Sequence, residues 1–106
     1  GVLVHQFTKI GPHAFIGGGF RAVQDVPPFI LAADHPLTYK GVNLVGLKRR
    51  GFSKEERKSI KQIYNLYFKS GLNRKDAMEK IKAEISTSTV RDQVVEFIQA
   101  SDRGII

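Results

Sequence analysis

The run VHQFTK IGPHAF IGGGFR AVQDVP, residues 4–27, decides the fold of the first part of the chain. It divides into four units of six residues, and each unit opens with an aliphatic or small apolar residue: Val4, Ile10, Ile16 or Ala22. An α-helix repeats every 3.6 residues or so and cannot present a period of six on one face. The period suits a parallel β-helix, in which the chain coils around three flat sides and one aliphatic residue per side points inward. A short Gly-rich β segment explains the same residues, so periodicity alone leaves both structures open.

The chain after Phe52 favours α-helices. Ser53 followed by Glu56 is a capping box, which predicts the start of a helix. The next apolar residues recur at the spacing of one helical face: Ile60, Ile63, Tyr64, Tyr67 and Phe68. Gly71 after Ser70 predicts the end of this helix.

Two further helices are expected before the end of the chain. Asn73 can cap the second helix, whose inward residues are Ala77, Met78, Ile81 and Ile85. Residues 86–89 make a break, and a third helix is expected from about Val90. Its apolar face holds Val90, Val94, Phe97 and Ile98, with Gly104 after it as a stop. Because short amphipathic helices must bury these faces against each other, the sequence predicts a small three-helix bundle after the β segment.

Composition excludes several classes of protein. The 106 residues are 42% hydrophobic and 25% charged, which is typical of one globular domain or of two small pieces sharing a core. The absence of Cys excludes a disulfide scaffold, and three His without a ligand pattern predict no metal site. No apolar run approaches the roughly 20 residues of a membrane span. Since Gly1 leads directly into an apolar run without an initiator Met, we expect the chain to be a piece of something longer.

The positive charge lies in one part of the chain. The net charge of +7 is accounted for between Lys48 and Glu84, a stretch rich in Lys and Arg. Such a stretch suits an anionic partner, although a solvated helix surface has the same composition. A basic helical module that binds nucleic acid or an acidic protein is therefore an alternative function. Aromatic side chains facing solvent among the basic residues would favour nucleic acid, but the aromatic residues of the first helix fall on its apolar face.

Several strings, in order along the chain, resemble one known family. These are HQF at residues 5–7, QDVPP at 24–28, GVN at 41–43 and GLKRRGFS at 46–53. Together they closely resemble the C-terminal part of bacterial UDP-N-acetylglucosamine acyltransferase, and the resemblance covers essentially the whole chain. It implies the last coils of a left-handed parallel β-helix over 1–33, a nucleotide-binding loop or connector over 34–52, and a C-terminal helical domain over 53–106.

The resemblance implies an activity and its partners. Enzymes of this family transfer a 3-hydroxyacyl chain from acyl carrier protein to the 3-hydroxyl of UDP-N-acetylglucosamine, the first step of lipid A synthesis. They are cytoplasmic homotrimers, and direct transfer to a hydroxyl needs no cofactor. The resemblance gives no expectation of nucleic acid as a partner.

The resemblance also assigns site residues one by one. The general-base His of the family lies on coils N-terminal to this chain, so no catalytic residue is expected here and residues 1–106 alone should be inactive. His5 and Gln6 correspond to a pair that lines the active-site groove, and Gly18 corresponds to a glycine of the acyl channel.

The remaining substrate-binding positions implied are Asn43, Arg49 and Arg50, on the loop that holds the nucleotide. An adjacent Arg pair suits a diphosphate because each guanidinium can make two parallel hydrogen bonds to phosphate oxygens. A salt bridge to a nearby acid such as Glu55 is the structural alternative. Val45 stands where some family members have an acidic residue.

Overall fold

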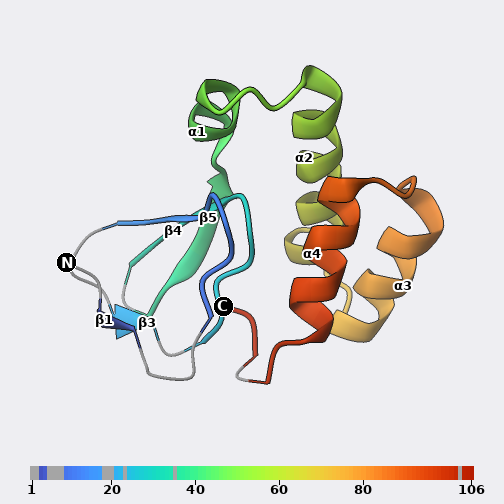
Figure 1. Ribbon diagram of the computed structural model, residues 1–106. Helices are drawn as coiled ribbons and strands as arrows, with labels where there is room; N and C mark the ends of the chain where they lie inside the picture. Colours follow the sequence, from blue (N-terminus) through green and yellow to red (C-terminus); the bar gives the residue numbers. More distant parts are fainter. Residues whose placement is uncertain (1–2, 5–8, 18–20, 23, 35, 103) are drawn as a thin grey trace.

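The structure is a computed structural model that describes residues 3–4, 9–17, 21–22, 24–34, 36–102 and 104–106. It has a β part in the first half of the chain and helices in the second half (Figure 1). The β part and the long helices lie side by side, and the shortest helix, α1, lies at one end of the molecule.

The first strands pair in parallel. β1 (Leu3–Val4) pairs with β3 (Arg21–Ala22), with Val4 opposite Ala22, so the chain returns to the same position after three of the six-residue units. β2 (Phe15–Ile16) pairs in parallel with β4 (Ile30–Ala33), and an isolated parallel bridge joins Ile10 to Val26. This parallel return is the pairing that the six-residue repeat predicts. Of the aliphatic repeat positions, Ile16 packs partly buried against the core, while Ile10 is 38% exposed.

Residues 34–52, expected as a nucleotide-binding loop or connector, contain regular structure. β5 (Thr38–Val42) pairs antiparallel with β4, and α1 (Leu44–Arg49) follows it directly. The turn between the two strands includes Asp34 at a positive φ of 76°. The strand depends on its pairing with β4, and a helix of 6 residues is too short to display an apolar period, so neither element has a strong local signal.

The three longer helices begin at, or within one residue of, their predicted starts. α2 (Lys54–Phe68) has the complete capping box: Ser53 Oγ accepts from the Glu56 amide at 3.0 Å, and Glu56 Oε1 accepts from the Ser53 amide at 2.8 Å. α3 (Arg74–Glu84) is capped by Asn73, whose Oδ1 accepts from the Asp76 amide at 2.8 Å. α4 (Thr89–Gln99) is capped by Ser88 and begins one residue before the predicted position.

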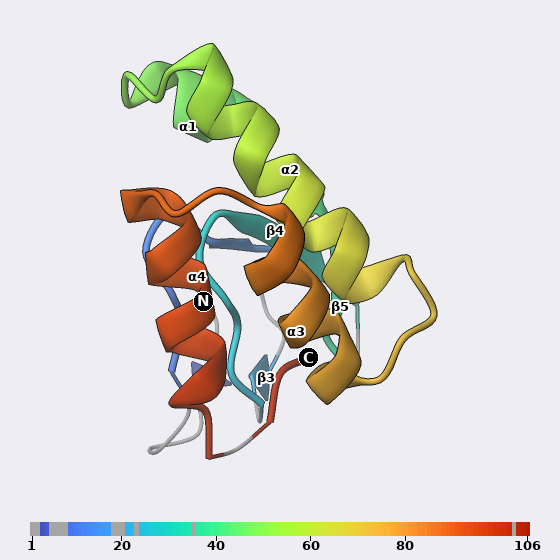
Figure 2. The same cartoon turned by 90° about the vertical axis from the view of Figure 1, so that its right-hand side faces the viewer.

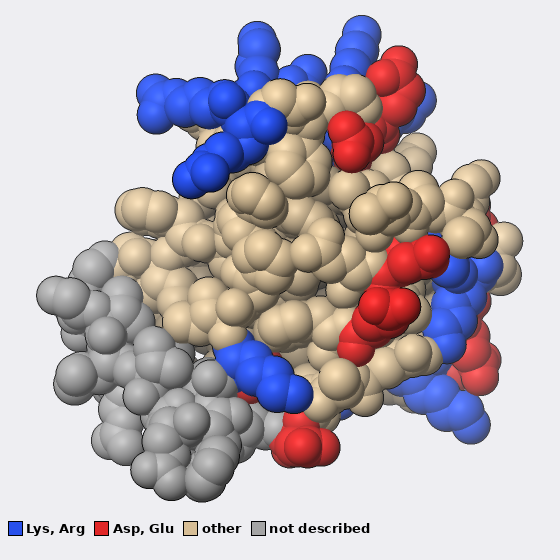
Figure 3. Space-filling model, in the orientation of Figure 1, with Lys and Arg blue, Asp and Glu red and all other residues tan. Residues whose placement is uncertain are grey.

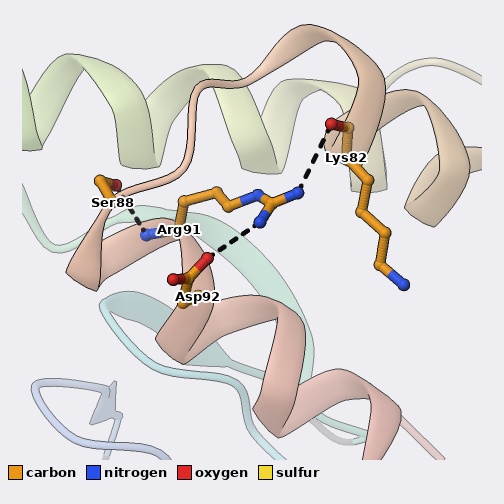
Figure 4. A network of polar contacts seen from close by, with 4 residues as sticks. All are labelled: Lys82, Ser88, Arg91 and Asp92. Atoms are coloured by element: carbon orange, nitrogen blue, oxygen red, sulfur yellow. Dashed lines mark hydrogen bonds and ion pairs between the residues drawn. The ribbon is translucent and has the colours of Figure 1, made fainter.

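Arg91 joins the start of α4 to the end of α3 (Figure 4). Its guanidinium donates to the carbonyl of Lys82 at 3.4 Å and to the carboxylate of Asp92 at 2.9 Å, while its backbone amide donates to Ser88 Oγ at 3.2 Å. These contacts fix the turn between the two helices, which the sequence predicted only as a break.

One hydrophobic core joins the β part to the helices. Figure 2 shows α2, α3 and α4 together on the side of the molecule that faces away from β1 and β3 in Figure 1. The buried side chains of both halves belong to one cluster, including Val26, Phe29, Ile30, Leu37 and Val42 from the first half and Ile60, Ile63, Tyr64, Ile81, Val90, Val94 and Ile98 from the helices. The first half therefore packs directly against the helices, and each half covers the apolar face of the other.

Tyr64 makes a polar contact within this core. It is fully buried, and its hydroxyl donates to the carbonyl of Pro28 at 2.7 Å. Burial, together with the neighbouring Tyr39 and Tyr67, raises the pKa of Tyr64 well above its ordinary value of 10.0.

This pKa shift predicts a loss of stability at alkaline pH. Because the folded-state pKa lies above the unfolded one, the stabilisation is fully present below pH 10 or so and is lost as the pH rises toward the folded-state value. Urea unfolding at pH 8, 10 and 11 should show the loss above pH 10. The Tyr64→Phe variant should be less stable by about 1 kcal/mol at pH 8, because the hydrogen bond is lost, but its stability should fall less above pH 10. An equal alkaline loss in the Phe variant would assign the effect to other groups.

Candidate functional site

The predicted site residues that the structure describes lie on α1 and at its two ends. Asn43 is the N-cap of α1, Arg49 is in its last turn, and Arg50 is the C-cap. Leu47 is fully buried, so it holds the helix against the core while Arg49 and Arg50 remain exposed. The chain then turns at Gly51, whose φ is +84°, a conformation that favours glycine. The short helix thus carries two adjacent cations on an anchored support.

Lys and Arg gather at this end of the molecule. Figure 3 shows them over the region of α1 and the start of α2. The two ion pairs found among the described residues join Lys40 to Asp34 and Arg91 to Asp92, so neither uses Arg49 or Arg50. The predicted alternative, a salt bridge to Glu55, is not formed among these residues. Two exposed guanidinium groups that make no ion pair with the described residues are suited to bind an external anion.

Asn43 makes hydrogen bonds to several segments. Its backbone N–H donates to the carbonyl of Phe29 at 2.7 Å, and its side-chain Nδ2 donates to the carbonyl of His13 at 3.1 Å. Its Oδ1 accepts from the Gly46 amide at 3.2 Å, which caps the helix. Asn43 is a predicted binding residue, and these bonds show that it also anchors the helix.

His13, whose carbonyl accepts from Asn43 Nδ2, is an exposed residue beside this anchor. Its ring stacks on Phe29 at a centroid distance of 5.9 Å and meets the edge of Phe52 at 5.0 Å. His13 has a positive φ of 59° and forms, with Pro12, the turn that follows Gly11. The Gly-Pro pair signals a turn, but nothing local indicates that the turn meets Asn43.

The other three predicted binding residues, His5, Gln6 and Gly18, lie outside the described residues. The structure therefore places Asn43, Arg49 and Arg50 on one short helix, and all six binding assignments stay predictions. Val45 is 66% exposed on the same helix.

A hollow among the described residues lies elsewhere, between the start of α2 and the turn from α3 to α4. It has a volume of about 540 Å³, and its lining includes Glu55, Ser59, Glu84 and Ser88. Of the predicted site residues, the three that the structure describes, Asn43, Arg49 and Arg50, do not line it. The described part of the chain contains no cluster of three His, Cys, Asp or Glu side chains placed to hold a metal, and none of its helices is long and apolar enough to cross a bilayer.

The aromatic residues of α2 do not form a stacking surface among the basic residues. Tyr64 is fully buried, and Tyr67 and Phe68 pack partly buried against the core. Phe68 stacks on Tyr39 at a centroid distance of 4.2 Å. These contacts use the aromatic faces inside the protein, so they give no support to the nucleic-acid alternative.

Comparison with known proteins identifies the family. The family model described as UDP N-acetylglucosamine O-acyltransferase, domain 2, matches residues 25–106. Two curated relatives are both named acyl-[acyl-carrier-protein]–UDP-N-acetylglucosamine O-acyltransferase. The Myxococcus xanthus protein is 41% identical over 102 residues, covering 96% of this chain and 40% of the relative. The Aliivibrio salmonicida protein is 43% identical over 103 residues, covering 97% of this chain and 39% of the relative.

Solved structures give the same result. The UDP-N-acetylglucosamine acyltransferase of Bacteroides fragilis superposes with a TM-score of 0.96 at 45% identity, covering 99% of this chain and 41% of that one. The Francisella novicida enzyme superposes with a TM-score of 0.92 at 41% identity, covering 99% of this chain and 39% of that one. The chain thus spans about two-fifths of the length of these relatives. Its sequence, its fold and the matched family model agree, and the chain belongs to the UDP-N-acetylglucosamine O-acyltransferase family.

Proposed function

We propose that this chain forms the nucleotide-sugar-binding, carrier-facing part of an O-acyltransferase. The whole enzyme would transfer a 3-hydroxyacyl chain from acyl carrier protein to the 3-hydroxyl of UDP-N-acetylglucosamine, the first step of lipid A synthesis. The relatives at 41% and 43% identity are named for this pair of substrates. The observation that carries the proposal is the exposed pair Arg49 and Arg50 on the anchored helix α1.

The chemistry of the arginine pair fits a diphosphate. A guanidinium is planar and always charged, and it can donate two parallel hydrogen bonds to phosphate oxygens. Among the described residues, no carboxylate forms an ion pair with Arg49 or Arg50. UDP carries two linked phosphates, and two adjacent guanidinium groups can neutralise both charges.

The remaining predicted binding residues fit the same reaction. We place His5 and Gln6 in the active-site groove and Gly18 on the acyl channel, because these residues match the family's motif. No residue of this chain is assigned as the general base, and no cofactor is required for direct transfer to a hydroxyl. A base removes the hydroxyl proton as the sugar oxygen attacks the acyl thioester, and the carrier thiol leaves.

The division of the chain follows from the same proposal. Residues 1–33 would form the last coils of a left-handed parallel β-helix, 34–52 the nucleotide-binding connector, and 53–106 a three-helix domain. The parallel pairing of Val4 with Ala22 supports the coils. The packing of both α3 and α4 on α2 supports the helical domain.

The basic end of the molecule suits the second substrate. Acyl carrier protein, which carries the acyl group in this reaction, is acidic. A surface rich in Lys and Arg would therefore steer it toward the site. This attraction should weaken as salt rises, because exposed charges are screened beyond about 10 Å at 0.1 M salt.

Activity is the experiment that tests the proposed function. A full-length protein carrying these residues should transfer a 3-hydroxyacyl chain from acyl carrier protein to UDP-N-acetylglucosamine. The polypeptide of residues 1–106 alone should show no transfer above background, because the family's general base lies on preceding coils. Product formation followed by mass spectrometry checks both. Inactivity of the full-length protein with this substrate pair would contradict the proposal, and turnover by the 106-residue polypeptide would make His5 the next candidate for the base.

Assembly gives a separate prediction. We propose a cytoplasmic homotrimer, and the large apolar side chains left exposed on the described surface include Phe15 at 61%, Val45 at 66% and Leu44 at 40%. Burying such side chains between copies would be favourable. Light scattering of the full-length protein across a dilution series should give three times the monomer mass. A monomer at micromolar concentration would contradict the trimer.

A further inference from the structure

Phe52 follows the arginine pair closely and holds the end of α1. Its backbone N–H donates to the carbonyl of Leu47 at 3.1 Å, which closes the last turn of the helix. Its carbonyl accepts from Arg57 Nη1 of α2 at 3.3 Å. Gly51, at a φ of +84°, separates Phe52 from Arg50. Because one residue lies between them, a displacement of Phe52 also displaces the arginine pair.

Two other rings fix the ring of Phe52. Phe52 meets the ring of His13 at a centroid distance of 5.0 Å and the ring of Phe29 at 5.6 Å, both edge to face, and His13 stacks on Phe29 at 5.9 Å. Aromatic pairs at these distances stabilise a fold beyond the area that they bury. Phe29 is fully buried, and Phe52 packs partly buried against the core. We call His13, Phe29 and Phe52 the aromatic anchor, since they join the β part to the chain that leaves α1.

Two residues of the aromatic anchor have an unusual backbone. His13 has a φ of 59° and Phe29 a φ of 72°, in the left-handed region that bulky residues rarely adopt. The Phe29 carbonyl accepts from the backbone N–H of Asn43 at 2.7 Å, and the His13 carbonyl accepts from Asn43 Nδ2 at 3.1 Å. Such strain persists where surrounding contacts hold it, and it is frequent at functional sites. Here the two strained residues direct both carbonyls to the start of α1.

The short helix depends on these contacts. α1 has 6 residues, and isolated helices of this length are not stable in water. Leu47 holds its middle in the core, while the aromatic anchor holds both of its ends. Among the described residues, neither Arg49 nor Arg50 forms an ion pair that would fix its guanidinium independently. The position of the arginine pair therefore follows the aromatic anchor.

We propose that Phe52 is a positioning residue for the nucleotide sugar and acts through Arg49 and Arg50. The rings of His13 and Phe29 hold Phe52, and Phe52 fixes where the guanidinium groups meet the diphosphate. This inference rests on the proposed nucleotide-binding function. It assigns a role to the ring of His13 as an aromatic contact, so the ring nitrogens of His13 are not required.

The affinity of full-length variants for the nucleotide sugar tests the inference. Phe52→Ala should raise the Kd and KM for UDP-N-acetylglucosamine by roughly 3- to 30-fold, because the charged bonds to phosphate are weakened but not removed. kcat should stay near wild type. In the Arg49→Ala/Arg50→Ala background, Phe52→Ala should weaken binding little further. Phe52→Leu keeps an apolar side chain without the ring, so it should show a smaller defect of the same kind and serves where Phe52→Ala does not fold.

His13 gives a second test. His13→Phe keeps a ring against Phe29 and Phe52, so it should bind the nucleotide sugar like wild type. His13→Ala should reproduce part of the Phe52→Ala defect, and the two alanine substitutions together should weaken binding by less than the product of their separate effects. Equal defects in His13→Phe and His13→Ala would show that the ring nitrogens are needed, which would contradict the inference.

Phe68→Ala is the matched control. Phe68 is also a partly buried phenylalanine with three aromatic neighbours, but it lies at the far end of α2 from the arginine pair. Its replacement should lower the Tm and leave the affinity for UDP-N-acetylglucosamine unchanged.

The outcomes separate the inference from the function beneath it. If Phe52→Ala, like Phe68→Ala, lowers the Tm and leaves the affinity unchanged, Phe52 serves stability alone and the inference is wrong, while the proposed function stands. The inference is also wrong if Phe52→Ala weakens binding by the same factor with and without the arginines. If the double arginine variant binds UDP-N-acetylglucosamine like wild type, the proposed role of the pair fails and the inference fails with it.

Discussion

Replacing Asp25 with alanine is expected to lower the free energy of unfolding by about 3 to 5 kcal/mol, because two hydrogen bonds to a buried carboxylate are lost, each worth about 1.5 to 3 kcal/mol. Asp25 is 1% exposed. Its Oδ1 accepts from the Lys9 amide at 2.7 Å and its Oδ2 accepts from the Ser101 hydroxyl at 2.6 Å. One carboxylate therefore joins the β part to the end of the helical part.

The backbone of Asp25 strengthens this junction. Its amide donates to the carbonyl of Gly104 at 2.8 Å, and its carbonyl accepts from the Ile106 amide at 3.1 Å. The C-terminus accordingly lies beside the β part in Figure 1. Loss of the side chain would leave the Lys9 amide without its acceptor and would loosen the last residues of the chain.

Urea unfolding of the purified protein measures the effect, and Ser101→Ala is the control. That variant removes one of the two bonds and keeps the carboxylate with the Lys9 amide, so it should cost only about 1 to 2 kcal/mol. Destabilisation of less than about 1 kcal/mol by Asp25→Ala would mean that the junction carries little of the stability.

Replacing Arg49 or Arg50 with alanine should weaken binding of the nucleotide sugar by about 10- to 150-fold, equivalent to roughly 1.5 to 3 kcal/mol for lost charged hydrogen bonds to phosphate. Both arginines are exposed at the end of α1, so the substitutions should change the Tm little. Lys at either position should restore only part of the affinity, because an ammonium supplies charge without the planar fork.

Calorimetric titration of the full-length variants with UDP-N-acetylglucosamine measures the change. Lys80→Ala is the matched control, since it removes one exposed positive charge from α3, away from α1. It should bind like wild type. If both alanine variants bind like Lys80→Ala, the arginine pair is an ordinary solvated surface.

The helices could be predicted from the sequence because their signals are local. Ser53 with Glu56, and Asn73 before α3, act within one helical turn, and the structure confirms both caps. The apolar faces were also correct in most positions, with Ile60, Ile63 and Tyr64 fully buried. Val95, which is buried beside Val94, was not predicted to be buried, because its position does not fit the spacing of the apolar face.

The pairing of β5 and the position of the last residues depend on contacts between residues far apart in the chain. β5 exists because it pairs with β4, and the last residues are held by Asp25, whose partners Lys9 and Ser101 lie 16 and 76 positions away. No periodicity or capping pattern carries this information. The same holds for the site: the family resemblance placed Asn43 and the arginines there, but the bond from Asn43 to His13 spans 30 positions and needed the structure.

The central claim is that Arg49 and Arg50 hold the diphosphate of a nucleotide sugar. A crystal structure of the full-length protein with UDP-N-acetylglucosamine tests it most directly. We expect a guanidinium nitrogen of Arg49 or Arg50 within about 3 Å of a diphosphate oxygen. A well-ordered nucleotide sugar whose diphosphate lies away from both arginines would contradict the account.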